Sequence, residues 1–238
     1  MSQYFYGKNV VRQLLEDRAE VRMVWLAVND RELENLCERN HVRIRRTDKK
    51  YMTKLTGTDR HQGICAEMPD YKTYSLEELM AGVPAGKKGL FILLDQLEDP
   101  HNLGAVLRTA DAVGADGVIF KKTHAVGLTP TVAKVSAGAI DTVKCCAVTN
   151  LNRTLETLQK AGWWVVGTDM NGQDYRSLDY DFNTVLVIGN EGNGISRLVR
   201  EKCDYVVSLP MVGKIESLNA SVTAGILMYE IFSSRNPM

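Results

Sequence analysis

The sequence predicts an α/β protein in which a small N-terminal α/β unit precedes a larger domain built on a parallel, doubly wound sheet. Near-continuous apolar runs, typical of strands covered on both faces, recur after residue 89. Helical segments separate most of these runs, and regular alternation of strand and helix indicates a parallel sheet. The length of 238 residues also favours one medium domain with a small partner.

The larger domain is expected to span residues 89–238. Its predicted strands cover residues 90–94, 117–120, 145–148, 163–168, 184–188 and 205–209. Its predicted helices cover residues 102–113, 130–139, 151–161, 194–201 and 217–233. In sheets of this class, ligands bind beyond the carboxyl ends of the strands, so the loops that follow the strands are the places to search for a site.

The first 70 residues form the smaller predicted unit. Its expected helices cover residues 10–16, 31–40 and 48–55, with Asp48 as a cap of the last one. Its expected strands cover residues 21–28, 42–46 and 63–68. Residues 71–88 contain Gly82, Pro84, Gly86 and paired lysines around a short helix at 75–80, a composition that predicts a linker between the two domains.

Charge is balanced over the whole chain but not within it. Lys+Arg and Asp+Glu number 29 each, which excludes a uniformly basic nucleic-acid-coating protein. Residues 1–72 hold 14 basic and 11 acidic side chains, and the remainder holds 15 and 18, so the two parts carry +3 and −3. The run HVRIRRTDKK at 41–50 is either a solvated face or an edge that contacts phosphate groups. The RNA-binding candidates on the second interpretation are Arg43, Arg45, Arg46, Lys49, Lys50 and Arg60.

Cysteine usage and hydropathy indicate a soluble intracellular protein. The five cysteines are odd in number and form no CxxC pair, so buried reduced thiols are expected rather than disulfides or a zinc site. No apolar run approaches the roughly 18 residues of a membrane helix, and the first residues lack the apolar core of a signal peptide. We therefore expect a cytoplasmic protein with no membrane span and no metal.

The loop after the strand at 90–94 and the helix that follows it contain two candidate site residues. Asn102 is either a helix N-cap or a site residue. Arg108 falls on the polar face of the following helix, where solvation alone would explain it. Taken alone, each residue is better explained by its structural role.

The loop after the strand at 184–188 is rich in glycine. It reads GNEGNGIS, and its three glycines permit unusual backbone angles and close approach of a ligand. The spacing matches neither GxGxxG nor a P-loop, so nucleotide phosphate binding is not supported. Ordinary turn chemistry remains the alternative.

The loop after the strand at 205–209 leads into a long apolar helix. Ser217 is a possible N-cap of that helix, and Leu218, Val222, Ile226 and Tyr229 recur at helical spacing. Small residues at 220, 221, 224 and 225 would allow close packing, either within one subunit or across a dimer interface.

Together, in this order, the three loops resemble the SpoU (TrmH-like) RNA 2′-O-ribose methyltransferases of the SPOUT superfamily. The matching stretches are DPHNLGAVLRTADAVGADGVIF (99–120), VLVIGNEGNGIS (185–196) and VSLPMVGKIESLNASVTAGILMYE (207–230). At the front, YGKNVVRQLL (6–15) and DRHQGICAEM (59–68) are similar to the RNA-binding domain of the RlmB-type branch, which methylates a guanosine of large-subunit (23S) ribosomal RNA.

The resemblance implies a SPOUT-type parallel sheet with a deep C-terminal trefoil knot. It also implies a homodimer with its site at the subunit interface, and S-adenosyl-L-methionine (SAM) bound in a bent form by the second and third loops. The implied catalytic residues are Asn102, Arg108, Glu191, Ser217 and Asn219. The implied cofactor-binding residues are Gly189, Asn190, Gly192, Leu209, Met211, Ser217 and Leu218.

The role of Arg108 and the identity of the RNA stay open at this stage. Arg108 is either the activator of the ribose hydroxyl or an electrostatic stabiliser, since its guanidinium normally stays charged. The RNA is a ribosomal RNA, a tRNA or a ribosomal site tied to antibiotic resistance. A non-catalytic RNA-binding or ribosome-assembly protein is a further alternative, and a nicotinamide dehydrogenase is disfavoured by the missing GxGxxG.

Overall fold

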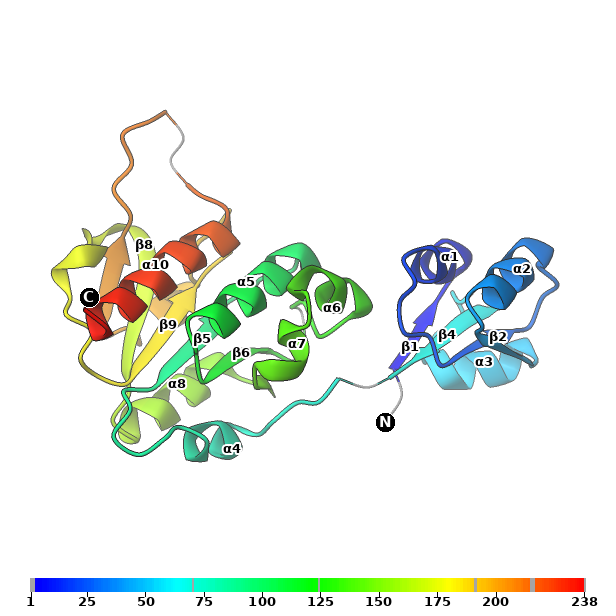
Figure 1. The fold of residues 1–238 in the computed structure, drawn as a ribbon, viewed down its shortest axis with the longest axis horizontal. Helices are drawn as coiled ribbons and strands as arrows, with labels where there is room; N and C mark the ends of the chain where they lie inside the picture. The colour runs from blue at the N-terminus through cyan, green and yellow to red at the C-terminus, as the bar shows by residue number, and fades with distance from the viewer. Residues whose placement is uncertain (1–2, 70, 124, 191, 215–216, 238) are drawn as a thin grey trace. The chain divides into compact units, whose positions relative to one another are not determined.

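The computed structural model describes residues 3–69, 71–123, 125–190, 192–214 and 217–237. The chain divides into two compact units, Met1–Tyr71 and Lys72–Met238 (Figure 1). No helix in the described part of the chain is both long enough and apolar enough to cross a membrane.

The first unit is a four-stranded mixed sheet with helices on both faces. Its strands are ordered β1 (Gln3–Tyr6), β4 (Ile64–Met68), β2 (Met23–Leu26) and β3 (Arg43–Arg46). Strand β4 is antiparallel to both of its neighbours, whereas β2 and β3 are parallel. Helices α1 (Lys8–Glu16) and α2 (Arg31–Arg39) cover one face, and α3 (Lys49–Thr56) covers part of the other.

The predicted elements of this unit are confirmed, with one omission. Asp48 caps α3, as expected, because its side chain accepts a hydrogen bond of 2.8 Å from the backbone N–H of Tyr51. Asp30 caps α2 in the same way. Strand β1 was not predicted, since its four residues, QYFY, show no clear alternation of apolar and polar side chains. Its pairing with β4 forms one edge of the sheet.

The second unit contains the predicted parallel sheet. All of its strands run in one direction, in the order β10 (Tyr205–Ser208), β8 (Trp164–Asp174), β9 (Thr184–Ile188), β5 (Leu90–Leu94), β6 (Gly117–Lys121) and β7 (Cys145–Val148). Every residue of β5 and β9 is buried, as expected for central strands covered on both faces.

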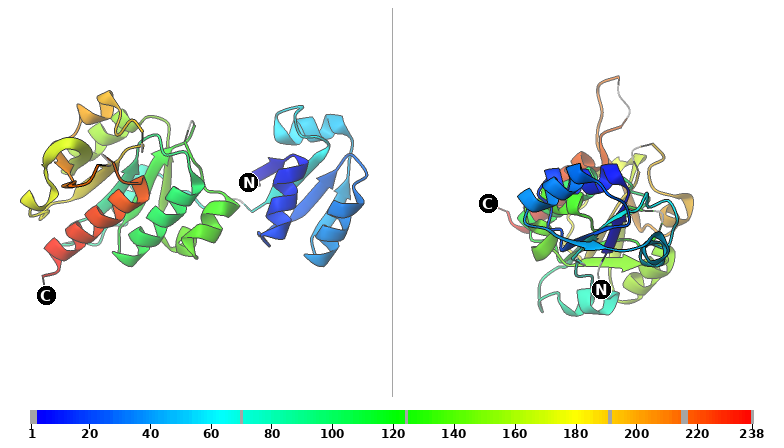
Figure 2. Two further views of the ribbon diagram at one scale, coloured as in Figure 1. Left: turned by 90° about the horizontal axis from the view of Figure 1, so that it is seen from above. Right: turned by 90° about the vertical axis from the view of Figure 1, so that its right-hand side faces the viewer.

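Helices cover both faces of this sheet. On one face, α5 (Pro100–Ala112) packs against α6 (Pro130–Ser136), α7 (Ala139–Thr142) and α10 (Ala220–Arg235), and α5 and α10 lie side by side (Figures 1 and 2). On the other face, α4 (Leu76–Ala81), α8 (Leu151–Lys160) and α9 (Arg197–Arg200) share one apolar cluster with β5 and β9. A 3₁₀ turn, η1 (Tyr175–Ser177), follows β8.

Several predicted helix boundaries in this unit were wrong, and each has a local cause. Helix α5 begins at Pro100 because Asp99 caps it, so Asn102 is not an N-cap but lies buried within the helix. Helix α10 begins at Ala220, with Asn219 rather than Ser217 as its cap. The single helix expected at 130–139 is interrupted where the backbone turns left-handed at Ala137 and Gly138. The helix expected at 194–201 is only one turn, α9.

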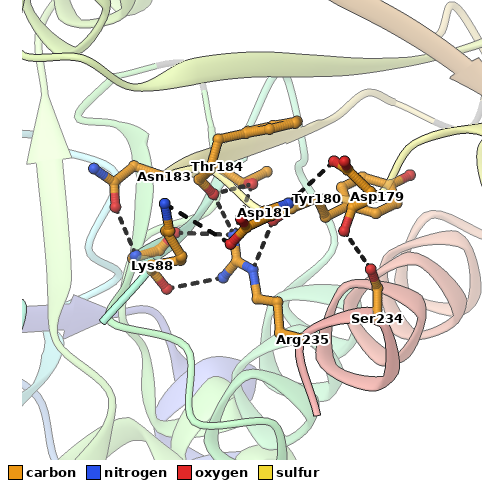
Figure 3. Close-up of polar contacts among 10 residues, drawn as sticks. Lys88, Asp179, Tyr180, Asp181, Asn183, Thr184, Ser234 and Arg235 are labelled. Carbon is orange, nitrogen blue, oxygen red and sulfur yellow. Dashed lines mark hydrogen bonds and ion pairs between the residues drawn. The ribbon is translucent and has the colours of Figure 1, made fainter. Parts of the chain in front are cut away.

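A half-buried arginine fixes the far end of α10 to the start of the sheet (Figure 3). The Arg235 guanidinium donates hydrogen bonds to the carbonyl oxygens of Lys88, Tyr180 and Phe182, at 2.9, 3.0 and 2.6 Å. It also donates to the hydroxyl of Thr184, the first residue of β9, at 2.8 Å. Burial lowers the pKa of this guanidinium, and the carbonyl dipoles compensate its charge. We call these contacts the Arg235 clasp.

All five cysteines are free. Cys37, Cys65, Cys145 and Cys146 are buried, and Cys203 is half-buried. The prediction that most of the thiols lie in buried, apolar surroundings is confirmed. Among the described residues, no group of three or more His, Cys, Asp or Glu side chains is arranged to hold a metal ion.

Candidate functional site

Two of the predicted loops are joined at the carboxyl edge of the sheet. Strands β5 and β9 are neighbours, so the loops that follow them emerge side by side. The Asn190 side-chain amide donates a hydrogen bond of 3.2 Å to the carbonyl oxygen of Gln96. The backbone N–H of Ser196 donates one of 2.7 Å to a carboxylate oxygen of Asp95. The glycine-rich loop is therefore held at both of its ends by the loop after β5.

Asp95 is a site residue that the sequence analysis missed. Its side chain is buried, and it contacts the glycine-rich loop 101 residues further along the chain. A charged residue directly after an apolar strand, as in LFILLD, is the signal that could have identified it. We assign to Asp95 the positioning of the loop.

The glycine-rich loop folds back on itself through a contact that only glycine permits. The backbones of Asn190 and Gly194 exchange hydrogen bonds of 3.0 and 2.8 Å. A Cβ atom on Gly189 would lie 2.2 Å from the carbonyl carbon of Gly194, which no side chain allows. Gly192 donates to the Asn190 side-chain oxygen at 2.9 Å and is exposed. Glu191, predicted as a catalytic residue, lies outside the described residues.

The third predicted segment meets the first one through two asparagines. The Asn219 side-chain amide donates a hydrogen bond of 2.9 Å to the side-chain oxygen of Asn102. The Asn219 oxygen accepts hydrogen bonds from the N–H groups of Ser221 and Val222, at 2.9 and 3.4 Å, and so caps α10. The start of α10 is thereby fixed to the first turns of α5. Asn102 and Asn219, predicted together as site residues, are in direct contact.

Arg108 and Ser217 are not joined to this pair. Arg108 is exposed on α5, and its side chain makes no ion pair or hydrogen bond with any described residue. Ser217 is also exposed and has no such contact within the described ranges. The Arg108 guanidinium is therefore available to a negatively charged group outside the chain.

The segment after β10 suits the adenosyl group of the cofactor that the resemblance implies. Leu209 and Leu218 are half-buried and Met211 is exposed, so these side chains offer apolar surface to an adenine base. The backbone of 211–214 makes no hydrogen bond to any described residue, which leaves its N–H and C=O groups for a ligand. Together with the exposed Gly192, the segment therefore offers apolar surface and hydrogen-bonding groups, which are the two kinds of contact that S-adenosylmethionine needs.

A hollow of about 500 Å³ lies at the opposite end of the same sheet, where its strands begin. Its lining includes Lys87, Asp181 and Arg235, next to the first residues of β5 and β9. None of the predicted site residues lines it. The Arg235 clasp occupies part of this end of the sheet, so we do not assign this hollow to the reaction.

The predicted RNA-binding residues of the first unit are all exposed. Arg43, Arg45 and Arg46 lie on the edge strand β3, Lys49 and Lys50 begin α3, and Arg60 lies in the loop before β4. Arg46 differs from the others because it donates to a Glu34 carboxylate oxygen at 2.7 Å and to the carbonyl oxygen of Val28 at 2.8 Å. The charge of Arg46 is therefore partly compensated by Glu34 within the unit.

Two sequence families match the two units. The SpoU rRNA methylase family matches residues 89–229. The family described as RNA 2′-O ribose methyltransferase substrate binding matches residues 4–74. A Bacillus subtilis (strain 168) protein named as a TrmH family tRNA/rRNA methyltransferase, YacO, is 44% identical over 242 residues, which cover 99% of this chain and 97% of that protein.

Solved structures agree with these matches. The SpoU methyltransferase AviRb of Streptomyces viridochromogenes, in complex with the cofactor AdoMet, is 25% identical with a TM-score of 0.63, covering 98% of this chain and 90% of its own. The TrmH/SpoU tRNA modifying enzyme of A. aeolicus is 30% identical with a TM-score of 0.57, covering 67% of this chain and 82% of its own. The family matches, the full-length relative and the joined loops lead to one conclusion: the chain belongs to the SpoU rRNA methylase family and is an RNA 2′-O-ribose methyltransferase whose cofactor is S-adenosylmethionine.

Proposed function

We propose that this enzyme methylates the ribose of a guanosine in large-subunit (23S) ribosomal RNA, and that it acts in the cytoplasm. The observation that carries the choice of RNA is the separate basic unit at the front of the chain. The A. aeolicus tRNA modifying enzyme corresponds to 67% of this chain, whereas the match to AviRb covers 98%. A front unit with its own basic edge suits recognition of an element within a large folded RNA.

The division of labour follows the two units. Residues 1–70 bind the substrate RNA, residues 89–238 transfer the methyl group, and residues 71–88 connect them. Part of the connection belongs structurally to the second unit, since Leu79 of α4 is fully buried in the cluster shared by α8 and β5. RNA contacts in the first unit come from Arg43, Arg45, Arg46, Lys49, Lys50 and Arg60.

The reaction needs an activated hydroxyl held in line with a methyl group. When bound, S-adenosylmethionine supplies a methyl group that is already electrophilic because it is attached to a sulfonium. The protein must position the 2′-hydroxyl and stabilise the negative charge that develops on its oxygen. The exposed, unpaired Arg108 guanidinium provides that charge stabilisation, either at the developing alkoxide or at the adjacent phosphate.

The remaining catalytic residues hold this arrangement. The Asn219–Asn102 hydrogen bond fixes the start of α10 against α5, on which Arg108 lies six residues after Asn102. Ser217 precedes that cap and is assigned, with Glu191, to the catalytic set. Gly189, Asn190, Gly192, Leu209, Met211, Ser217 and Leu218 contact the cofactor.

A homodimer and a trefoil knot complete the proposal. Helix α10 packs on α5 with one side, while Val222, Ile226 and Tyr229 expose apolar side chains on the other, which a second copy of the chain would cover. Strand β10 lies at the edge of the sheet, beside β8, yet α10 contacts α5 and β9. This change of position between β10 and α10 supports the proposed trefoil knot.

The test is a comparison of 2′-O-methyl groups in ribosomal RNA from cells that make the protein and cells that lack it. One guanosine of the large-subunit RNA should lose its methyl group in the cells that lack it. Purified protein should transfer methyl groups from S-adenosylmethionine to large-subunit RNA from those cells, and not to their tRNA. Methylation of tRNA alone would contradict the choice of RNA while leaving the 2′-O-methyltransferase activity intact.

A further inference from the structure

The first unit contains an aromatic and arginine stack. The Arg45 guanidinium carbon lies 4.9 Å from the centroid of the Trp25 ring. The ring of Tyr51 lies 5.6 Å from the Trp25 ring, centroid to centroid, at an interplanar angle of 37°. Trp25 is only 5% exposed, whereas Tyr51 is 42% exposed. Tyr51 is therefore the member of the stack that offers an aromatic face to an external group.

The register of the sheet explains how these side chains meet. Trp25 on β2 is paired with Arg45 on β3, and Met23 is paired with Arg43, so both arginines project from the same face as Trp25. Helix α3, which carries Tyr51, packs on this face over β1 and β4. The part of the face formed by β2 and β3 thus lies beside α3, with Trp25 between Tyr51 and the arginines.

The stack is held in place before any ligand arrives. The Trp25 indole N–H donates a hydrogen bond of 3.1 Å to a Glu67 carboxylate oxygen, which fixes the ring. The Asp48 cap bonds to the backbone N–H of Tyr51 and fixes the first turn of α3. A rigid aromatic ring loses little side-chain entropy on binding. Because of these two hydrogen bonds, the carboxylates of Glu67 and Asp48 are already engaged with protein donors.

Uncompensated positive charge lies on β3 and at the start of α3, the elements that carry Arg45 and Tyr51. Arg43, Arg45, Lys49 and Lys50 are exposed and make no ion pair with any described residue, in contrast to Arg46, which is bound to Glu34. A flat aromatic face among free cations is the combination that binds unpaired nucleotides, in which the ring stacks on a base and the cations contact phosphates.

We propose that Tyr51 is a stacking platform for an unpaired base of the substrate RNA, flanked by phosphate contacts from Arg43, Lys49 and Lys50. This inference rests on the proposed function, since it names the form of RNA that the first unit reads. Bases within an A-form duplex are stacked on each other and cannot reach the ring, so the site selects a loop, a bulge or a single strand. The stack of Arg45 on Trp25 supports the ring from within.

The test measures RNA binding by the full chain and by three variants. The probes are a mixed-sequence 20-nucleotide single-stranded RNA and the duplex that it forms with its complement, followed by fluorescence anisotropy over a range of salt concentrations. Tyr51→Leu keeps the apolar contact with Trp25 and removes the aromatic face. Tyr51→Phe restores the face without the hydroxyl. Tyr175→Leu is the matched control, because the Tyr175 ring lies next to Arg176 but that arginine is neutralised by Asp174.

Tyr51→Leu should weaken binding of the single strand about tenfold and leave duplex binding and the salt dependence unchanged. Tyr51→Phe should bind like the unaltered protein, and so should Tyr175→Leu. Equal losses on both probes, no loss on either, or a loss in Tyr51→Phe equal to that in Tyr51→Leu would each overturn the platform. Methyl transfer by the unaltered protein to large-subunit RNA, measured in parallel, tests the proposed function separately, since the platform can fail while that activity persists.

Discussion

Asn219 and Asn102 are 117 residues apart in the sequence, and their side chains share a hydrogen bond of 2.9 Å. The same Asn219 side chain caps α10 through its oxygen. One residue therefore sets both where the last helix begins and where it lies relative to α5. The two functions use different atoms of the amide, so substitutions can separate them.

Asn219→Asp should retain the cap and lose the link to Asn102. A carboxylate still accepts from the N–H groups of Ser221 and Val222, but it cannot donate to the Asn102 oxygen. We expect unfolding in urea to be nearly unchanged and methyl transfer to be strongly reduced. Asn219→Ala should lose the cap as well, at about 1 kcal/mol of unfolding free energy. Full activity in Asn219→Asp would contradict the role of the link.

Arg108→Ala should abolish methyl transfer while leaving the affinity for S-adenosylmethionine nearly intact. The guanidinium is exposed and makes no hydrogen bond or ion pair with any described residue, so its removal leaves the fold and the cofactor loops in place. Loss of one charge stabiliser at a developing oxyanion typically costs about a hundredfold or more in rate. Transfer of labelled methyl groups and calorimetry measure the two quantities. Arg153→Ala removes another exposed helical arginine, on α8, and should be fully active.

Asp95→Ala should weaken cofactor binding, although Asp95 is not one of the predicted cofactor-binding residues. The carboxylate accepts the Ser196 N–H and so holds one end of the glycine-rich loop. Loss of that acceptor should lower the affinity for S-adenosylmethionine about tenfold, measured by calorimetry. Asp95→Asn keeps an oxygen at this position and should recover most of the affinity. If the alanine variant bound the cofactor normally, the loop would not depend on Asp95.

Buried thiols should make the fold sensitive to alkaline pH. Burial raises the pKa of the Cys65 and Cys145 thiols to about 12, whereas an unfolded thiol has a pKa of about 8.5. Between these values the unfolded chain loses protons that the folded chain keeps. The stabilisation is therefore complete below about pH 8 and decreases as the pH rises, by about 1.4 kcal/mol per pH unit for each thiol.

Urea unfolding at pH 8 and pH 10, in the presence of a reductant, checks this expectation. Cys145→Ala should lose about 2 kcal/mol less than the unaltered protein over that interval, since one of the titrating thiols is gone. Identical losses in the two proteins would indicate that Cys145 ionises in the folded state.

Patterns of apolar residues predicted the parallel sheet well, and local chemistry corrected the ends of its helices. Strand β5 is an unbroken apolar run, and the structure confirms its boundaries because a central parallel strand is buried on both faces. The start of α5 was wrong because Asp99 and Pro100 form a stronger start signal than Asn102. The start of α10 was wrong by three residues for a similar reason, the cap by Asn219.

Contacts between residues that lie far apart in the sequence could not be predicted from the sequence alone. The resemblance named Asn102 and Asn219, but no periodicity relates two residues 117 positions apart, so their hydrogen bond emerges only in the folded chain. Asp95 was missed because a single charge after a strand has no pattern of its own. The basic run at 41–50 showed where charge gathers, but only the register of β2 and β3 revealed that Arg45 stacks on Trp25 whereas Arg46 binds Glu34.

The Arg235 clasp also bears on the order in which the protein can fold during synthesis. Its hydrogen bond to Lys88 closes a separation of 147 residues, nearly the whole length of the second unit. Strands β5 and β9 emerge from the ribosome earlier, but the carbonyl groups beside them receive their donor only after residue 235 has been made. Closure at such long range is a slow step in folding. Until α10 has been made, the face of the sheet that it covers stays exposed, and exposed apolar surface makes a partly folded chain prone to aggregation.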